Sequence, residues 1–469
     1  MTKRPRYFNL EPIMNPKSIA VIGASDNPDK IGHVILANNV ASGFRGAIYP
    51  ININASGTIM GYTAYKSILD VKEKVDLAVV AVPAEVVPKV VEECGRAGVR
   101  GIIVVSGGFS EVGRKDLQDK VTRSGMKYNI PIIGPNCLGV TDSYSKIDTL
   151  FLPAAKIDKP VVGGVSFASQ SGAVGSSVLD MIDNEGFGLA RFISYGNAAV
   201  VDEVDILNYL ADDEKTKVIV FYIEGVQRGK EFIEAAKRAA LKKPIVVSKG
   251  GMTDEGAKAA HSHTAALAGS HQAYEAVFKQ FGFIMADDIQ ELLNLSKIFE
   301  TQPLPKGRRI AILTNGGGTG VLATDALYEH GLQIAEMSKK TVESLRKVMP
   351  PIVNVRLPLD MAGDAEKTRF EAALAAFEAD PKIDAIIAIA LFQTPGADEN
   401  VAAKLVEYGT KMRKPMVVVS PGGSYTKRQR QIIEKGGVPV YESPGEAAKA
   451  LAALASYAEY RDSHVKKSR

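Results

Sequence analysis

The chain has 469 residues, of which 46% are hydrophobic and 23% are charged, and its formal net charge is +4 at pH 7. That length suits about three globular domains, and so small a net charge excludes an extended nucleic-acid-binding surface. The cysteines, Cys94 and Cys137, are too few for a disulfide framework or a cysteine zinc site. The N-terminus has no signal-peptide pattern, and no apolar run approaches the ~18 residues of a membrane span. We therefore expect a cytoplasmic protein without membrane or nucleic-acid partners.

Short apolar strands alternate with helical patterns along the whole chain. The clearest strands are expected at residues 18–23, 77–83 and 101–106. Unbroken apolar strands separated by helices are typical of parallel sheets that are covered on both faces. The predicted fold class is therefore α/β with doubly wound sheets. The expected domains are a Rossmann-like domain at residues 1–143 and two further doubly wound domains at residues 144–301 and 306–469.

The turn after the first strand is a candidate nucleotide site. Gly23 is followed by Ala24 and Ser25, so the second glycine of the G-x-G-x-x-G dinucleotide fingerprint is missing. A nicotinamide site is thus weakly supported, while a ligand whose phosphates meet hydroxyl, lysine and backbone amide groups remains open. Ordinary strand-end turns are the alternative. The candidate cofactor-binding residues at this sheet edge are Gly23, Ser25, Lys30, Val82, Pro83, Ser106, Gly107, Gly108 and Asn136.

The second and third predicted domains resemble each other in sequence. A strand, a turn of small residues and a helix recur at residues 165–180 and 310–325, and a Lys-Pro pair before an apolar strand recurs at residues 243–244 and 414–415. The matched pairs in the first of these repeats are Ser169 with Thr314, Gly175 with Gly320, and Asp180 with Asp325. Self-similarity of this kind indicates an internal duplication.

Each copy carries a turn that is suited to an anion. Both turns follow a strand and open a helix, where free backbone N–H groups and the positive end of the helix dipole attract phosphate. A tight turn without a ligand is the alternative for either one alone, and two matched copies favour a function in which both helix N-termini converge on one phosphoryl group. The candidate phosphate-binding residues are Ser169, Gln170, Ser171 and Gly172 in one copy and Asn315, Gly316, Gly317 and Gly318 in the other.

Two of the six histidines, His261 and His263, stand among small residues after the apolar segment at 244–251. A neutral imidazole is a competent nucleophile near pH 7 and can accept a phosphoryl group, and a carboxylate such as Glu224 could hold its other ring nitrogen. The third domain has an apolar residue at the position of Glu224 and no histidine after its own Gly-Gly pair. A solvent-exposed histidine loop is the alternative, and His-x-His alone completes no metal site, so none is predicted.

Several motifs together resemble the α subunit of the ADP-forming acyl-CoA synthetases, relatives of succinyl-CoA synthetase. Residues 134–139 resemble the family's Gly-Pro-Asn-Cys-Pro-Gly, and residues 357–365 resemble its Leu-Asp-Val-Gly-Gly-Gly-Ala segment. Residues 262–269 resemble Ser-His-Thr-Gly-x-Leu-Ala-Gly, with Ala265 in place of the glycine. The resemblance covers nearly the whole chain. It implies a CoA-binding domain followed by two flavodoxin-like, succinyl-CoA synthetase-like domains.

The resemblance also implies a mechanism and partners. His263 would be the phosphorylated histidine, Glu224 the acid that stabilises it, and the paired turns the phosphate site. Acyl-CoA and phosphate would give an acyl phosphate and CoA, and the histidine would carry the phosphoryl group toward ADP. Because no ATP-grasp domain is found in the chain, ATP or ADP and Mg would be bound by a separate ATP-grasp β subunit in an α2β2 assembly. The open alternatives are a non-catalytic acyl-CoA-binding protein and a nicotinamide-dependent oxidoreductase.

Overall fold

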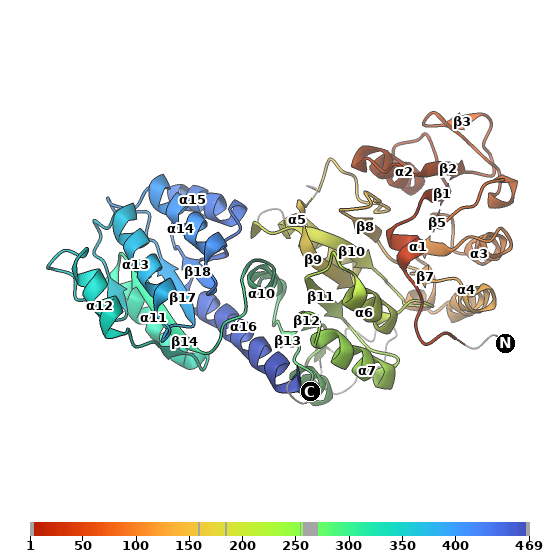
Figure 1. Ribbon diagram of the computed structural model, residues 1–469. Coiled ribbons are helices and arrows are strands. Elements are labelled where there is room, and N and C mark those ends of the chain that lie inside the picture. The colour runs from red at the N-terminus through yellow and green to blue at the C-terminus, as the bar shows by residue number, and fades with distance from the viewer. Residues whose placement is uncertain (1–3, 158–159, 183–184, 254, 257–270, 466–469) are drawn as a thin grey trace. The chain divides into compact units, whose positions relative to one another are not determined.

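The computed structural model describes residues 4–157, 160–182, 185–253, 255–256 and 271–465 (Figure 1). The chain divides into two compact units: residues 1–183 with 188–289 form the first unit, and residues 184–187 with 290–469 form the second. The predicted nucleophile His263 and its neighbour His261 lie outside the described residues.

Three large sheets, two in the first unit and one in the second, form the described structure, together with a short β3–β4 hairpin. The elements around the first sheet are α1 (Glu11–Met14), β1 (Ser18–Ile22), α2 (Ile31–Ser42), β2 (Ala47–Ile51), β3 (Thr58–Ile59), β4 (Tyr62–Thr63), η1 (Ile68–Asp70), β5 (Leu77–Val80), α3 (Val87–Arg96), β6 (Gly101–Val104), η2 (Ser110–Val112), α4 (Lys115–Tyr128) and β7 (Ile132–Ile133). Those of the second sheet are β8 (Gly139–Asp142), β9 (Val162–Ser169), α5 (Gly172–Ile182), β10 (Leu189–Ser194), α6 (Glu203–Asp212), β11 (Val218–Ile223), α7 (Gly229–Ala240), β12 (Ile245–Lys249), α9 (His271–Gln280) and β13 (Ile284–Met285).

The third sheet and its helices make up the second unit. Its elements are α10 (Ile289–Thr301), β14 (Arg309–Thr314), α11 (Gly317–Glu329), β15 (Gln333–Ile334), α12 (Lys339–Arg346), β16 (Leu359–Asp360), α13 (Lys367–Ala379), β17 (Ala385–Ile389), α14 (Glu399–Lys411), β18 (Met416–Val419), α15 (Ser424–Lys435), β19 (Val440–Tyr441) and α16 (Pro444–Val465). Within the described residues, none of the helices combines the length and apolar character that crossing a membrane requires.

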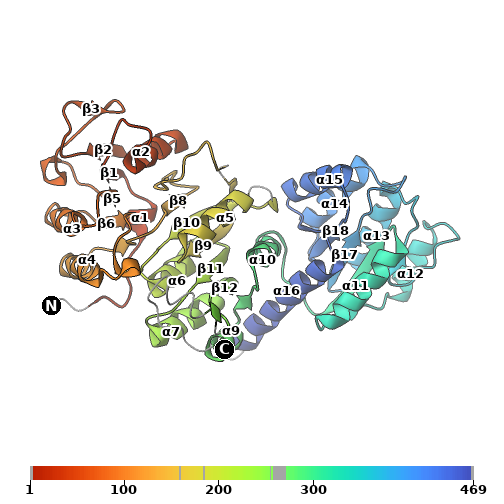
Figure 2. The ribbon, with the colours of Figure 1, turned by 180° about the vertical axis from the view of Figure 1, so that it is seen from behind.

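The first sheet is parallel, with strand order β2-β1-β5-β6-β7. Its central strands β1, β5 and β6 are buried along their whole length, which explains their unbroken apolar sequences. Helices α3 and α4 pack side by side next to this sheet (Figure 2). The strand order reverses between β1 and β5, and ligands of open α/β sheets bind outside the carboxyl ends of the strands at such a point.

The strand β8 lies within the residues 1–143 that the sequence predicts for the first domain. It pairs antiparallel with β10 and forms one edge of the second sheet, whose order is β13-β12-β11-β9-β10-β8. The sheet boundary therefore falls before Gly139. Antiparallel edge strands on otherwise parallel sheets are common, and this one joins the first two domains into a single compact unit.

The predicted duplication is confirmed by the strand order. The third sheet runs β15-β14-β17-β18-β19, with β16 also paired to β14, and this order matches β10-β9-β11-β12-β13 of the second sheet. The third sheet differs in one place. Both β15 and β16 pair with the same side of β14, whereas in the second sheet β10 alone pairs with the matching side of β9. Helix α12 separates β15 from β16 in the chain.

The repeated Lys-Pro pairs have the same structural role in both copies. Lys243 Nζ donates to the carbonyl oxygens of Leu210 and Asp213 at the end of α6. Lys414 Nζ donates to the carbonyl oxygens of Phe377 and Asp380 at the end of α13 (2.7 and 2.5 Å). Each lysine thus adds a charged donor to carbonyl oxygens at a helix end, although the carbonyls of Asp213, Phe377 and Asp380 also accept from backbone N–H groups. Burial lowers the pKa of Lys243 to about 8 and also lowers the pKa of Lys414.

Candidate functional site

The candidate cofactor residues of the first domain lie at the carboxyl edge of the first sheet. Gly23 has φ +98°, and a Cβ there would lie 2.3 Å from the carbonyl oxygen of Ala81, so the turn after β1 requires glycine. Helix α2 approaches the same turn closely, since a Cβ on Gly32 would lie 2.0 Å from the carbonyl oxygen of Gly23. Ser25 is half-buried, and the exposed Lys30 is the N-cap residue of α2.

A second group of candidate residues is linked directly by hydrogen bonds. Ser106 Oγ donates to the carbonyl oxygen of Val82 (2.6 Å), and Asn136 N donates to the carbonyl oxygen of Ser106 (2.9 Å). A Cβ on Gly107 would lie 3.2 Å from Asn136 Oδ1. The structure therefore brings the ends of β5 and β6 together with the loop that precedes β8, and the neighbouring Pro83 is exposed.

Sequence reasoning missed two residues of this group, Glu111 and Asn197. Glu111 accepts hydrogen bonds from the backbone N–H groups of Gly108 (2.5 Å) and Phe109 (3.1 Å) and from Asn197 Nδ2 (2.6 Å). Burial opposes ionisation, but these hydrogen bonds outweigh it and lower the pKa of Glu111. Asn136 Nδ2 also donates to Asn197 Oδ1 (3.3 Å), so a loop of the second sheet is tied to the candidate cofactor residues. No local sequence pattern marks such a pairing.

The first phosphate turn connects β9 to α5. Ser169 Oγ donates to the carbonyl oxygen of Ser171 (2.6 Å), and Ser171 Oγ accepts from Val174 N (3.4 Å), which orders the first turn of α5. Gly172 begins the helix and is half-buried. The backbone N–H groups at this helix N-terminus make the turn chemically suited to an anion.

Gln170 makes a contact that the sequence does not foreshadow. Its Oε1 accepts from Glu224 N (2.7 Å) and from Gly225 N (3.1 Å), directly after β11. The turn that was predicted to hold phosphate and the residue predicted to be the acid are therefore joined by hydrogen bonds. The Glu224 side chain is 7% exposed.

A cavity of about 320 Å³ lies between these elements. It is lined by Asn136 from the loop before β8, by Gln170, Ser171 and Gly172 of the phosphate turn, and by Glu224. Leu138 and Phe151 add apolar surface to its wall. Ser176 and Asn197 also line it, so polar and apolar groups converge on one pocket, as is common in small-ligand sites.

Lys249 lies at the end of β12, beside Glu224. Burial lowers the pKa of Lys249, and the nearby Glu224 carboxylate opposes that effect. The Lys249 ammonium lies 4.8 Å from the centre of the Tyr274 ring, and a Cβ on Gly250 would lie 2.5 Å from Tyr222 Oη and 3.5 Å from Glu224 Cγ. A side chain at position 250 would therefore have to displace the Tyr222 hydroxyl group beside the acid.

The matching turn of the second unit has the same internal geometry. Thr314 Oγ1 donates to the carbonyl oxygen of Gly316 (3.0 Å), as Ser169 Oγ does to that of Ser171, and Asn315 Oδ1 accepts from Leu391 N (2.8 Å). Leu391 thus occupies the place of Glu224, as the sequence comparison predicted. A Cβ on Gly317 would lie 2.6 Å from Asp360 Oδ2, whereas Gly318 has open space. That the two turns converge on one phosphoryl group stays a prediction.

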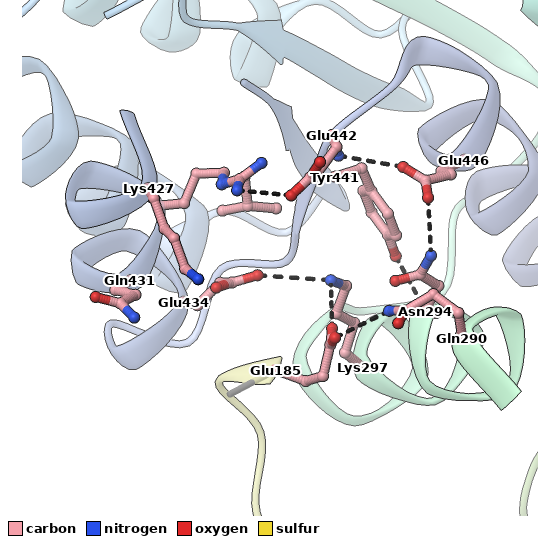
Figure 3. A pocket seen from close by; sticks show the side chains of 12 residues that line it. Glu185, Gln290, Asn294, Lys297, Lys427, Gln431, Glu434, Tyr441, Glu442 and Glu446 are labelled. Atoms are coloured by element: carbon pink, nitrogen blue, oxygen red, sulfur yellow. Dashed lines mark hydrogen bonds and ion pairs between the residues drawn. The ribbon is translucent and has the colours of Figure 1, made fainter. Parts of the chain in front are cut away.

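A second cavity, of about 390 Å³, lies within the second unit between α10, α15 and β19 (Figure 3). Lys297 lies 3.1 Å from Glu185 Oε2 and 3.5 Å from Glu434 Oε1, and its side chain is 5% exposed. Tyr441 is fully buried and donates to the carbonyl oxygen of Asn294 (2.9 Å). Burial, which outweighs the effect of Lys297, raises the pKa of Glu434 to about 7. These charged groups pair with one another, as expected of a structural cluster.

Comparison with known proteins places the chain in a family. A CoA binding domain model matches residues 17–143, a succinyl-CoA ligase like flavodoxin domain model matches residues 162–299, and a ligase-CoA domain model matches residues 310–465. The chain is 38% identical to the α subunit of the ADP-forming acetate–CoA ligase II of Pyrococcus furiosus, over 96% of this chain and 98% of that one. The chain belongs to the ADP-forming acyl-CoA synthetase family.

Two further relatives agree with this assignment. The ADP-forming acetate–CoA ligase of Methanocaldococcus jannaschii is 40% identical over 96% of this chain, and the match spans 64% of that longer protein. The structure of a dinucleotide-forming acetyl-coenzyme A synthetase 1 of Ca. Korarchaeum cryptofilum, in complex with phosphate and ADP, superposes with a TM-score of 0.93 at 36% identity, covering 98% of this chain and 99% of that one. The predicted fold class and the resemblance are confirmed, and the chain is an acid–thiol ligase of the ADP-forming type.

Proposed function

We propose that this chain, as an α subunit, takes part in interconverting acyl-CoA, ADP and phosphate with an organic acid, CoA and ATP through a phosphohistidine at His263. A phosphate oxygen attacks the thioester carbonyl, the carbon–sulfur bond breaks, and CoA leaves with an acyl phosphate remaining. The His263 imidazole then attacks phosphorus, and the carboxylate of the acid leaves. The phosphoryl group passes to a β-phosphate oxygen of ADP.

One observation carries this proposal. The cavity of about 320 Å³ is lined at once by the candidate cofactor residue Asn136, by the phosphate turn and by Glu224. The proposed chemistry needs the CoA-binding residues, the phosphate donors and the acid in one place, and candidate residues of all three kinds line the cavity. The described residues that flank the histidine segment also support it, because Gly250 lies beside Glu224 and Tyr274 Oη accepts from Val226 N (3.0 Å).

The roles of the site residues follow from this chemistry. The backbone amides at the start of α5, with Ser171 Oγ, would bind the transferred phosphoryl oxygens. Glu224 would accept the N–H of the other imidazole nitrogen and so keep the attacking nitrogen unprotonated. The turn at Gly23 and the groups around Ser106 would hold the nucleotide part of CoA at the carboxyl edge of the first sheet.

We propose further that the last acceptor is bound by a separate ATP-grasp β subunit, in a cytoplasmic α2β2 assembly in which that subunit binds ADP and Mg. The name of the Pyrococcus relative, an α subunit of almost the same length, supports this proposal. Purified chain alone should then form no ATP from acyl-CoA, phosphate and ADP, and addition of the β subunit should restore the reaction. ATP formation by the chain alone would contradict it.

The phosphohistidine is tested by label transfer. Wild-type chain and the variants His263→Ala, His261→Ala and Glu224→Gln are incubated with ³²P-labelled acetyl phosphate, and acid-labile, base-stable label is counted. We expect His263→Ala to take no label, His261→Ala to be labelled as wild type, and Glu224→Gln to be labelled more slowly. Label that survives in His263→Ala would refute the assignment, and label lost only in His261→Ala would move it to that residue.

A further inference from the structure

The loop that carries Glu224 is held by an unusual set of contacts. All four backbone N–H groups of residues 224–227 donate to side chains, and these come from the phosphate turn, from α9 and from α6. The bonds run from Glu224 N and Gly225 N to Gln170 Oε1 (2.7 and 3.1 Å), from Val226 N to Tyr274 Oη (3.0 Å) and from Gln227 N to Glu203 Oε1 (3.2 Å). A loop whose consecutive amides are all satisfied in this way has little freedom to move.

The first turn of α6 anchors the end of this loop twice. Arg228 makes a bidentate pair with Asp202, the N-cap residue of α6 (2.6 and 2.5 Å), and reaches Asp205 Oδ2 (3.1 Å). The next residue of the helix, Glu203, accepts from Gln227 N. Glu203 is 1% exposed, so its carboxyl group has been taken out of water to make this contact.

The duplicated domain of the second unit, which has Leu391 in place of Glu224, shows which residues stand at the positions of Tyr195 and Glu203 when the acid is absent. Tyr195 N donates to the carbonyl oxygen of Ser169, and Met361 N makes the identical bond to Thr314, so Tyr195 and Met361 correspond. Lys243 contacts the carbonyl of Leu210, seven residues after Glu203, and Lys414 contacts the carbonyl of Phe377, seven residues after Phe370. Counted back from these carbonyls, Glu203 and Phe370 correspond.

The copy without the acid is therefore apolar where the copy with the acid is polar. Met361 and Phe370 are both fully buried, as is Tyr195. Apolar residues at these positions are enough to build the fold, and a buried carboxyl group costs free energy of desolvation. The carboxyl group of Glu203 is retained where Glu224 must be held, which points to a role in the site.

We propose that Glu203 is a positioning residue, whose carboxyl oxygen fixes the 224–227 loop and so sets the Glu224 carboxylate against the histidine. This inference rests on the proposed function of Glu224. Glu203 touches neither the substrate nor the imidazole and acts through the backbone of Gln227.

The charges around Glu203 determine the form in which it acts. It is faced by Asp202 on its own helix, by Arg228 of the loop, and by the hydroxyl groups of Tyr195 and Tyr274. Burial, together with the negative charge of Asp202, raises the pKa of Glu203 to about 8. Near pH 7 the side chain is therefore mostly a neutral acid, and an amide of the same shape can replace it.

The experiment compares Glu203→Ala and Glu203→Gln with wild type, and uses Leu207→Ala as a matched control. Leu207 is a fully buried residue of the same helix. The first measurement is the single-turnover rate of label transfer from ³²P-acetyl phosphate to the full chain at pH 7. The second is hydrogen exchange of the backbone amides in the peptide that spans residues 224–227, which reports the position of the loop whatever the chemistry.

We expect Glu203→Ala to slow label transfer roughly 10- to 100-fold, by analogy with the removal of residues that orient metal ligands. We expect Glu203→Gln to stay within about threefold of wild type, because its amide oxygen still accepts from Gln227 N. Exchange at 224–227 should quicken in Glu203→Ala and not in Leu207→Ala. The inference is overturned if both alanine variants behave alike in either measurement. Absence of label from wild-type His263 would instead refute the proposed function, and the exchange result would still decide the role of Glu203.

Discussion

Replacing Gln170 by methionine separates two roles for a residue of the phosphate turn. The sequence predicts that Gln170 binds phosphate. In the structure, however, its side-chain oxygen Oε1 accepts hydrogen bonds from Glu224 N at 2.7 Å and from Gly225 N at 3.1 Å. Methionine has a similar length and almost no acceptor strength, so Gln170→Met would leave both N–H groups unpaired in a site where Gln170 itself is 8% exposed.

The magnitude follows from those two donors. A buried N–H group left without a partner costs about 1–3 kcal/mol, so two of them cost about 2–6 kcal/mol. The apolar side chain recovers part of this by burial, and we expect about 2–4 kcal/mol of local destabilisation. Because a chain of several domains does not unfold in one step, the loss is best measured as the free energy of opening at residues 218–228, by native-state hydrogen exchange.

The matched control is Ser171→Ala. Ser171 belongs to the same turn, and its Oγ makes only a long hydrogen bond, at 3.4 Å, to Val174 N. We expect this variant to raise the KM for phosphate with little change in exchange at residues 218–228, and Gln170→Met to quicken exchange and lower kcat. If Gln170→Met changes only the KM for phosphate and leaves exchange unaltered, the assignment of its oxygen to the Glu224 loop is wrong.

Three further predictions concern buried charge and the first sheet. The pKa of Glu203 in the folded protein is about 8, above its ordinary value of 4.5. Between about pH 4.5 and pH 8 the folded protein therefore holds a proton on Glu203 that the unfolded chain has lost, so the free energy of unfolding falls as pH rises through this range. Glu203→Gln should remove this dependence on pH, so the free energy of unfolding of the variant relative to wild type should increase from pH 5 to pH 9. The prediction is contradicted if the variant and wild type differ by the same amount at both pH values. Lys297→Met should destabilise the second unit by about 3–5 kcal/mol at neutral pH, because the Glu185 and Glu434 carboxylates lose their buried partner. The destabilisation should be smaller at pH 5, where Glu434, with a pKa of about 7, is protonated. Thermal unfolding at the two pH values checks this. Gly23→Ala should weaken CoA binding at least tenfold by calorimetry, since its Cβ would meet the carbonyl oxygen of Ala81 at 2.3 Å, and an unchanged Kd would show that the turn does not contact CoA.

The fold could be predicted from local pattern because its strands are buried on both faces. The strands expected at 18–23, 77–83 and 101–106 appear as β1, β5 and β6, each ending one to three residues earlier, where the chain leaves the ladder to form the candidate site. The antiparallel placement of β8 could not be predicted, because pairing with β10 depends on residues about fifty positions away and not on its own sequence.

The candidate site divides in the same way. Residues directly after parallel strands, such as Gly23, Gln170 and Glu224, can be assigned to one edge of a sheet from strand order alone. Their partners cannot be assigned, because Glu203 and Asn197 come from loops and helix starts that the fold brings in from elsewhere. Sequence reasoning thus places candidate residues at the edge of a sheet more readily than it identifies the residues that hold them there.

The duplication gives this protein an internal reference for separating architecture from chemistry. Where both copies keep a residue for the same contact, as Lys243 and Lys414 do at helix ends, the fold alone explains it. Where one copy has a buried carboxyl group and the other a buried phenyl ring, the fold requires only that the position be filled. Glu203 is such a position, and its counterpart is Phe370. The cost of burying that carboxyl group has no counterpart in the sister copy, and we attribute it to the loop that Glu203 holds and to Glu224 on that loop.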